Sequence, residues 1–270
     1  MRRSLWLSIV LLVAVIAVST LVSCKDEPEK AVPLTEDTTV WENGKTYTLT
    51  RNVKIDGRIT VTGNVRLLLS DGMRLNASYG ITVNAGSSLT IDGGAKGTGE
   101  LDATSQDPYQ AAIGGGARFE ACGTVVINGG QITAQSNRSG AGIGGAGDGA
   151  GGTITINGGN IMADGAYYGA GIGGGHCAAG GTVTINGGTV TAVGGDFSPS
   201  NFADGIGAGA SESECGTLKI GPQVALYGDN TDGNTHIGDG PMDPYTGERF
   251  KVMGAMKKTA PFTKHVIIAP

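Results

Sequence analysis

The feature that most constrains this chain is an internal repeat of 29 residues. Ile127, Ile156 and Ile185 each precede the tripeptide N-G-G and end a short run of alternating Thr and aliphatic residues. A second landmark, an isoleucine followed by glycine, recurs with nearly the same period at Ile113, Ile143, Ile172 and Ile206. Periods of 20–50 residues are typical of solenoids and propellers.

Each repeat contains three short strand-like runs, which in one unit are TITI (153–156), NIMA (160–163) and AGIG (170–173). Alternation places Ile154 and Ile156 on one face and the threonines on the other. Three strands joined at glycine corners form one coil of a spiral, and stacked coils pair in parallel with like residues in columns. The chain has 49 glycines in 270 residues, enough to supply such corners. We therefore predict an all-β parallel β-helix with coils of about 29 residues.

A hairpin array is the rival fold, because Asn-Gly between alternating residues is also a strong hairpin signal. A turn at Asn157-Gly158 would pair Ile154 with Ile161, but the third run would then have no partner. Residues 46–91 contain similar alternating runs, so we expect the spiral to begin near Val40. The predicted single domain is 39–270, with regular repeats over about 110–221 and a C-terminal cap over 222–270.

The first residues read as an export signal. Arg2 and Arg3 precede an apolar run from Leu5 to Val18 and then the sequence L-V-S before Cys24. A transmembrane anchor is the alternative, but L-V-S-C resembles the lipobox of bacterial lipoproteins, which implies cleavage after residue 23 and lipidation of Cys24. Residues 24–38 are charged and contain prolines, so we expect a flexible tether. The expected location is the outer membrane or cell surface, with the lipid as the membrane contact.

The repeats resemble a group of exported bacterial proteins. GAGIGGG loops alternating with GTVTINGGTVTA, after an entry segment like GITVNAGSSLTIDGG, are similar to right-handed parallel β-helix proteins of the pectate-lyase-like fold class, often described as carbohydrate-binding. The resemblance covers about 40–220, and the end FTKHVIIAP (262–270) resembles a closing strand. It implies a right-handed β-helix and a polysaccharide partner, although such repeats specify fold more strongly than function.

Nucleotides and nucleic acids are poor candidate ligands. Gly169, Gly171 and Gly174 fit the dinucleotide pattern G-x-G-x-x-G, but another strand-like run follows where a phosphate-binding helix is needed. Removal of the signal's two arginines takes the formal charge from −5 to −7, which disfavours nucleic acid.

The best candidate ligand-binding column lies four residues before each Ile-Gly landmark. Tyr109, Ser139, Tyr168 and Phe202 occupy it, and three of these four are aromatic although aromatic residues make up only 5% of the chain. Aromatic faces can stack on sugar rings. We predict a ligand-binding face that contains Tyr109, Arg138, Tyr167, Tyr168 and Phe202; the alternative is that the rings only cover the coil corners. Asn128, Asn157 and Asn186, in register with Asp92, are instead expected to form a structural ladder.

The sequence offers little for catalysis or metal binding. The three histidines (176, 236 and 265) occur in unrelated contexts, and neither a catalytic triad order nor zinc spacing is present. No cofactor is expected; residues 229–239 are rich in oxygen ligands for calcium, but turn formation explains them better. Cys177 and Cys215 lie in adjacent predicted coils and could form a disulfide, with reduced thiols as the alternative.

These observations predict a lipid-anchored surface protein that binds polysaccharide without altering it. A structural or adhesive protein that binds protein partners, or a polysaccharide lyase-like enzyme, are the alternatives.

Overall fold

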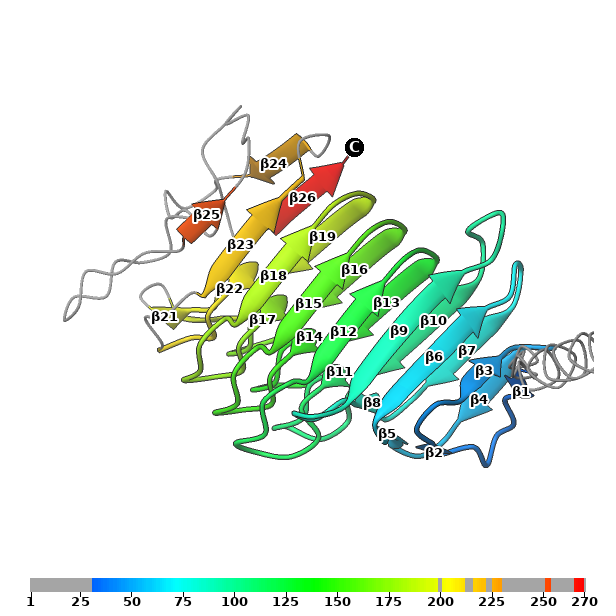
Figure 1. The fold of residues 1–270 in the computed structure, drawn as a ribbon. Helices are drawn as coiled ribbons and strands as arrows, with labels where there is room; N and C mark the ends of the chain where they lie inside the picture. The colour runs from blue at the N-terminus through cyan, green and yellow to red at the C-terminus, as the bar shows by residue number, and fades with distance from the viewer. Residues whose placement is uncertain are drawn as a thin grey trace, which may run out of the picture. The chain divides into compact units, whose positions relative to one another are not determined.

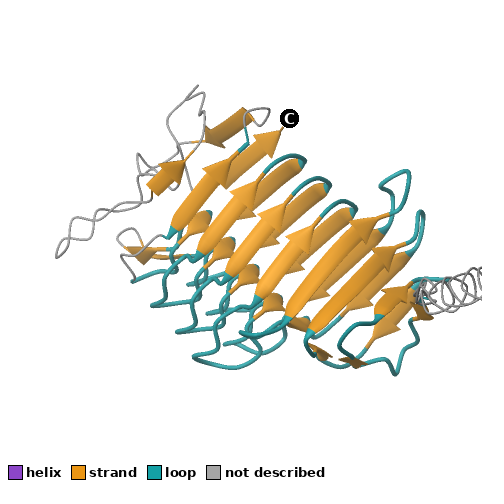
Figure 2. Ribbon diagram, in the orientation of Figure 1, coloured by secondary structure: helices purple, strands orange, loops and turns teal. Residues whose placement is uncertain are grey.

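The computed structural model describes residues 31–198, 201–211, 216–221, 225–229, 251–253 and 265–269. Within them the chain winds repeatedly through three sheets, with one strand in each sheet per coil (Figures 1 and 2). The described residues contain no helix, and so none that could span a membrane. The molecule is a right-handed parallel β-helix, which confirms the predicted fold.

Two of the sheets carry the longer strands. The nine-stranded sheet is parallel throughout, whereas in the eight-stranded sheet β26 pairs antiparallel with both β19 and β24. The nine-stranded sheet contains β1 (Val32–Pro33), β3 (Thr46–Thr48), β6 (Asn64–Leu69), β9 (Ser88–Gly93), β12 (Thr124–Ile127), β15 (Thr153–Ile156), β18 (Thr182–Ile185), β23 (Thr217–Ile220) and β25 (Lys251–Met253). The eight-stranded sheet contains β4 (Val53–Ile55), β7 (Arg74–Ala77), β10 (Glu100–Thr104), β13 (Gln131–Gln135), β16 (Asn160–Asp164), β19 (Thr189–Val193), β24 (Ala225–Asp229) and β26 (His265–Ala269).

The third sheet has seven short parallel strands. They are β2 (Val40–Trp41), β5 (Ile59–Val61), β8 (Ile81–Thr82), β11 (Ile113–Gly114), β14 (Ile143–Gly144), β17 (Ile172–Gly173) and β22 (Ile206–Gly207). A separate antiparallel pair, β20 (Asp196–Ser198) and β21 (Asn201–Phe202), enlarges the loop before β22.

Columns of aliphatic side chains fill the interior. Ile127, Ile156 and Ile185 are in register in adjacent coils of the nine-stranded sheet, and each is fully buried. Ile154 pairs with residues of the coils before and after it, and not with Ile161 as a hairpin would require. Parallel stacking keeps identical side chains in contact, so the repeat in sequence becomes a continuous core.

The spiral departs from the expected boundaries in two ways. Strand β1 pairs with β3, and Leu34 is only 1% exposed. The flexible tether predicted through residue 38 is therefore wrong for residues 32–34, because Val32 and Pro33 pair with β3 and Leu34 is buried in the core. Successive coils measured along Val65, Leu89, Val125, Ile154, Val183 and Leu218 contain 24, 36, 29, 29 and 35 residues, so the predicted length holds for the two central steps.

Close packing of neighbouring coils explains why glycine follows the isoleucine in the Ile-Gly landmark. Gly114, Gly144 and Gly173 have φ of 139°, 145° and 141°, and a Cβ on any of them would lie 1.9 Å from a carbonyl oxygen of the following coil. Only glycine accepts both that backbone conformation and that approach. The glycines of the dinucleotide-like pattern are equally confined, because a Cβ on Gly169, Gly171 or Gly174 would lie 1.9, 2.6 or 2.1 Å from a backbone carbonyl oxygen.

Candidate functional site

The candidate site is the loop flank, which we define as the loops that lead from the eight-stranded sheet into the seven-stranded sheet and from there to the nine-stranded sheet (Figure 2). Among the described side chains, the exposed aromatic rings are Tyr79, Tyr109, Phe119 and Tyr167, with exposed fractions of 44%, 41%, 69% and 56%. All four belong to this flank. The exposed aromatic rings of the described residues are therefore concentrated on the loop flank.

Backbone hydrogen bonds join the loops into one surface. The N–H groups of Gly147, His176 and Ala210 donate to the carbonyl oxygens of Tyr109, Ser139 and Tyr168 at 2.7, 2.7 and 2.8 Å. Each of these bonds links the loop after a short strand to the loop before the short strand of the preceding coil. Side chains from both loops of neighbouring coils are thereby brought together.

The predicted aromatic column exists in part. Hydrogen bonds from Ser139 N to Pro108 O and from Tyr168 N to Arg138 O, at 2.8 and 2.9 Å, hold positions 109, 139 and 168 in register. Tyr168 is half-buried, and its ring lies 4.7 Å from the imidazole of His176. The predicted ligand residues Tyr109, Arg138, Tyr167 and Tyr168 all lie on the flank. Phe202 has its backbone in β21, but its side chain lies outside what the structure describes.

Two arginines lie against these rings. The guanidinium carbon of Arg118 is 5.2 Å from the ring centre of Tyr109 and 4.8 Å from that of Phe119, and that of Arg138 is 5.8 Å from Tyr168. Arg118 Nε also donates to Asp148 Oδ2 at 2.6 Å, and this hydrogen bond raises the pKa of Arg118. Arg118 and Phe119 were not predicted as ligand residues, because only the folded loops bring them beside Tyr109.

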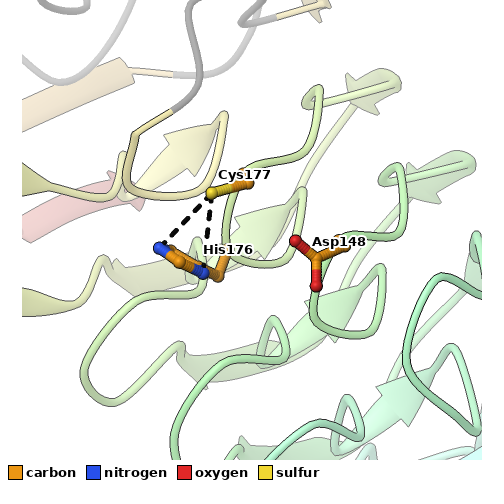
Figure 3. A group of neighbouring side chains, drawn as sticks. All are labelled: Asp148, His176 and Cys177. Atoms are coloured by element: carbon orange, nitrogen blue, oxygen red, sulfur yellow. Dashed lines mark hydrogen bonds between the residues drawn. The ribbon is translucent and has the colours of Figure 1, made fainter.

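A third group on the flank combines oxygen, nitrogen and sulfur ligands. The ligand atoms of Asp148, His176 and Cys177, here called the Asp-His-Cys cluster, all lie within 4.8 Å of one another (Figure 3). Cys177 Sγ is 3.4 Å from His176 Nε2. The sequence has no zinc spacing, so this cluster was not predicted. The available signal was the repeat itself, since Asp148 and Cys177 are 29 residues apart and so lie in neighbouring coils.

Other predicted residues have structural roles or lie outside the described residues. The Asn ladder is confirmed: Asn186 donates to Asn157 and Asn157 to Asn128 at 2.8 and 2.7 Å. Burial raises the pKa of Cys122 to about 12. Cys24 and Cys215 lie outside the described residues, so lipidation and the Cys177–Cys215 disulfide stay predictions, as does any calcium site at 229–239.

Comparison with known proteins supports the fold. A family model described as a beta helix repeat matches residues 125–148, 154–176 and 180–210, a span that includes Arg138, Tyr167 and Tyr168 but not Tyr109, Arg118 and Phe119. No curated protein and no solved structure matches the chain significantly.

Proposed function

We propose that the protein is an exported lipoprotein, anchored through Cys24 at the outer membrane or cell surface, whose loop flank binds polysaccharide without altering it chemically. The observation that carries the proposal is the gathering of Tyr109, Phe119, Tyr167 and two arginines on one flank. Exposed rings spread over all three sheets would not have supported it.

The spacing of the flank suits an extended sugar chain. Neighbouring coils are about 4.8 Å apart, so Tyr109 and Tyr168, two coils apart, are separated by roughly 10 Å along the spiral axis. Ring faces offer apolar surface to pyranose rings, and the guanidinium groups offer several N–H donors to hydroxyl or carboxylate oxygens. A shallow, repeating surface of this kind favours binding of a long chain over enclosure of a small molecule.

Affinity electrophoresis in gels containing plant, host or bacterial polysaccharides tests the proposal on the full chain. The Y109A/Y167A variant should weaken binding to a retarding polysaccharide by roughly five- to 150-fold, since each of the two stacked rings contributes about 0.5–1.5 kcal/mol. M162A is the matched control, because Met162 is 49% exposed on β16, away from the flank. Equal losses in both variants would overturn the assignment of the flank.

The alternatives give different results in the same set of experiments. Binding to no polysaccharide, together with concentration-dependent self-association or capture of a defined surface protein, would favour a structural or adhesive role. Release of unsaturated oligouronides, detected by ultraviolet absorbance, would favour a lyase.

The anchor is tested separately. Mass spectrometry of the mature protein should show acyl chains on Cys24, and the C24A variant should lose them and appear in the soluble fraction. Protease treatment of intact cells would then report whether the β-helix faces outward.

A further inference from the structure

We propose that the Asp-His-Cys cluster is a binding site for Zn²⁺ or a similar transition-metal ion. Its ligands are Asp148, His176 and Cys177, one oxygen, one nitrogen and one sulfur. This set suits Zn²⁺, because imidazole and thiolate bind borderline and soft ions, whereas Ca²⁺ and Mg²⁺ require an all-oxygen shell. The inference does not depend on glycan binding.

The distance between the nitrogen and sulfur atoms fits one bound ion. With bonds of roughly 2.1 Å to nitrogen and 2.3 Å to sulfur in tetrahedral geometry, these two ligand atoms lie about 3.6 Å apart. His176 Nε2 and Cys177 Sγ are 3.4 Å apart before any ion is added. Cys177 Sγ is also 3.6 Å from His176 Nδ1, so the thiol lies to the side of the imidazole and not along the Nε2 lone pair. The imidazole must therefore rotate before one ion can bind both atoms, whereas their separation can stay almost as it is.

The local backbone produces this arrangement from two adjacent residues. Side chains of adjacent residues in a strand point to opposite faces, which would separate His176 from Cys177. Cys177 instead has φ of 55°, in the left-handed region that residues with a Cβ rarely adopt. Its thiol is thereby turned to the side of the imidazole.

The neighbouring coil supplies the carboxylate. Asp148 N donates to His176 O at 2.7 Å, and Asp148 has φ of 61°, the conformation that Cys177 adopts one coil later. Gly147 occupies the position equivalent to His176, and a Cβ there would lie 3.1 Å from Ser139 Cβ and 3.2 Å from Tyr109 Cδ1. The ring of Tyr168, 4.7 Å from His176, restricts the orientation of that imidazole, as supporting residues do around metal sites.

Three protein ligands leave a fourth position for water or an external ligand, as in open zinc sites. Arg118 is the main opposing group, because it forms an ion pair with Asp148 at 2.6 Å. Arg118 binds Asp148 Oδ2, and its positive charge repels an ion bound at the other carboxylate oxygen. Removal of Arg118 should therefore tighten metal binding, which is the opposite of its expected effect on a glycan.

The test is titration of the reduced full chain with Co²⁺, followed by competition with Zn²⁺. Co²⁺ accepts the same ligand sets as Zn²⁺ and gives a thiolate-to-cobalt charge-transfer band only when sulfur is bound. We expect one equivalent to produce this band and Zn²⁺ to remove it. C177A should abolish the band, H176A and D148N should weaken Co²⁺ binding by at least about tenfold, and R118Q should strengthen it.

Two controls separate the site from other thiols. C122A removes a cysteine that is 3% exposed in the core and should leave the band unchanged. C215S removes the predicted disulfide partner and should leave the reduced protein's band unchanged. The proposal is wrong if reduced C215S gives no sulfur band, or if C177A and C122A give the same spectrum.

The flank variant Y109A/Y167A distinguishes this proposal from glycan binding. It should retain the parent's Co²⁺ spectrum while it loses polysaccharide affinity. A spectrum that fails in the parent leaves the glycan result standing, and a parent that binds no glycan leaves the metal result standing.

Discussion

A single methyl group at Gly144 should disrupt the spiral much more than the same methyl group at Gly72. Gly144 has φ of 145°, and a Cβ there would lie 1.9 Å from the carbonyl oxygen of Gly173 in the next coil. Gly72 also has a positive φ, of 72°, but a Cβ there would have no atom within 4 Å. The two positions therefore share backbone strain and differ in the approach of the neighbouring coil.

The expected magnitudes follow from this difference. For Gly72→Ala we expect the left-handed conformation to cost about 1–2 kcal/mol of unfolding free energy. For Gly144→Ala, strain in a glycine-only region costs about 1–3 kcal/mol, and forcing two coils apart adds about 1–3 kcal/mol. The expected loss of unfolding free energy for Gly144→Ala is therefore about 2–6 kcal/mol. The next coil cannot move away to reduce this loss, because Gly173 is packed equally closely against the coil that follows it.

Urea unfolding followed by far-ultraviolet circular dichroism measures both variants under the same conditions. Amide hydrogen exchange adds a local test, because each coil of a solenoid contacts only its neighbours. Loss of protection in Gly144→Ala should centre on strands β14 and β17 and their flanking loops. Equal destabilisation of the two variants would show that coil contact at the Ile-Gly landmark is not what requires glycine.

Three further predictions concern ionisable groups. The backbone N–H groups of Lys96 and Thr98 donate to the carboxylate of Asp71 and lower the pKa of that carboxyl group. The stabilisation from these hydrogen bonds is complete above about pH 4 and is lost as the pH falls through the lowered pKa. The D71N variant should therefore show a smaller decrease of the urea midpoint in acid. Arg58, whose pKa burial lowers to about 10, donates four hydrogen bonds to neighbouring coils, so R58M should cost more than about 3 kcal/mol in urea unfolding. Cys122, with its pKa raised to about 12, should resist iodoacetamide at pH 8 until urea unfolds the chain, as peptide mass spectrometry would show.

The fold could be predicted because each coil of a solenoid carries the same sequence pattern. Period-two alternation predicts that the side chains of Ile154 and Ile156 point into the core. The period of 29 predicts which residue pairs with each of them in the next coil. The Asn ladder followed from the same register. The same register places Asp148 beside Cys177 in the next coil, as found in the Asp-His-Cys cluster.

The loop flank was less predictable, because its contacts cross between two different loops. Arg118 follows β11 and Tyr109 precedes it, and their contact depends on how far each loop extends from the coil. Loop lengths are not set by the core, as the coils of 24 and 36 residues show. The start of the spiral was placed too late because Val32 and Leu34 stand alone in a charged segment, and only pairing with β3 reveals their role.

The Asn ladder has a direction. Every amide in it donates its N–H toward the N-terminal end of the spiral, and Asn128 passes the chain of hydrogen bonds to Asp92 at 2.9 Å. The row of like-oriented amides ends on Asp92, which accepts on both sides, because its other oxygen accepts a hydrogen bond from Arg66 Nε. Asparagine at position 92 could still accept from Asn128, but its NH2 group would then face Arg66, which is itself a donor. The carboxylate of Asp92 thus ends the row and is the final acceptor for the amides that donate toward it.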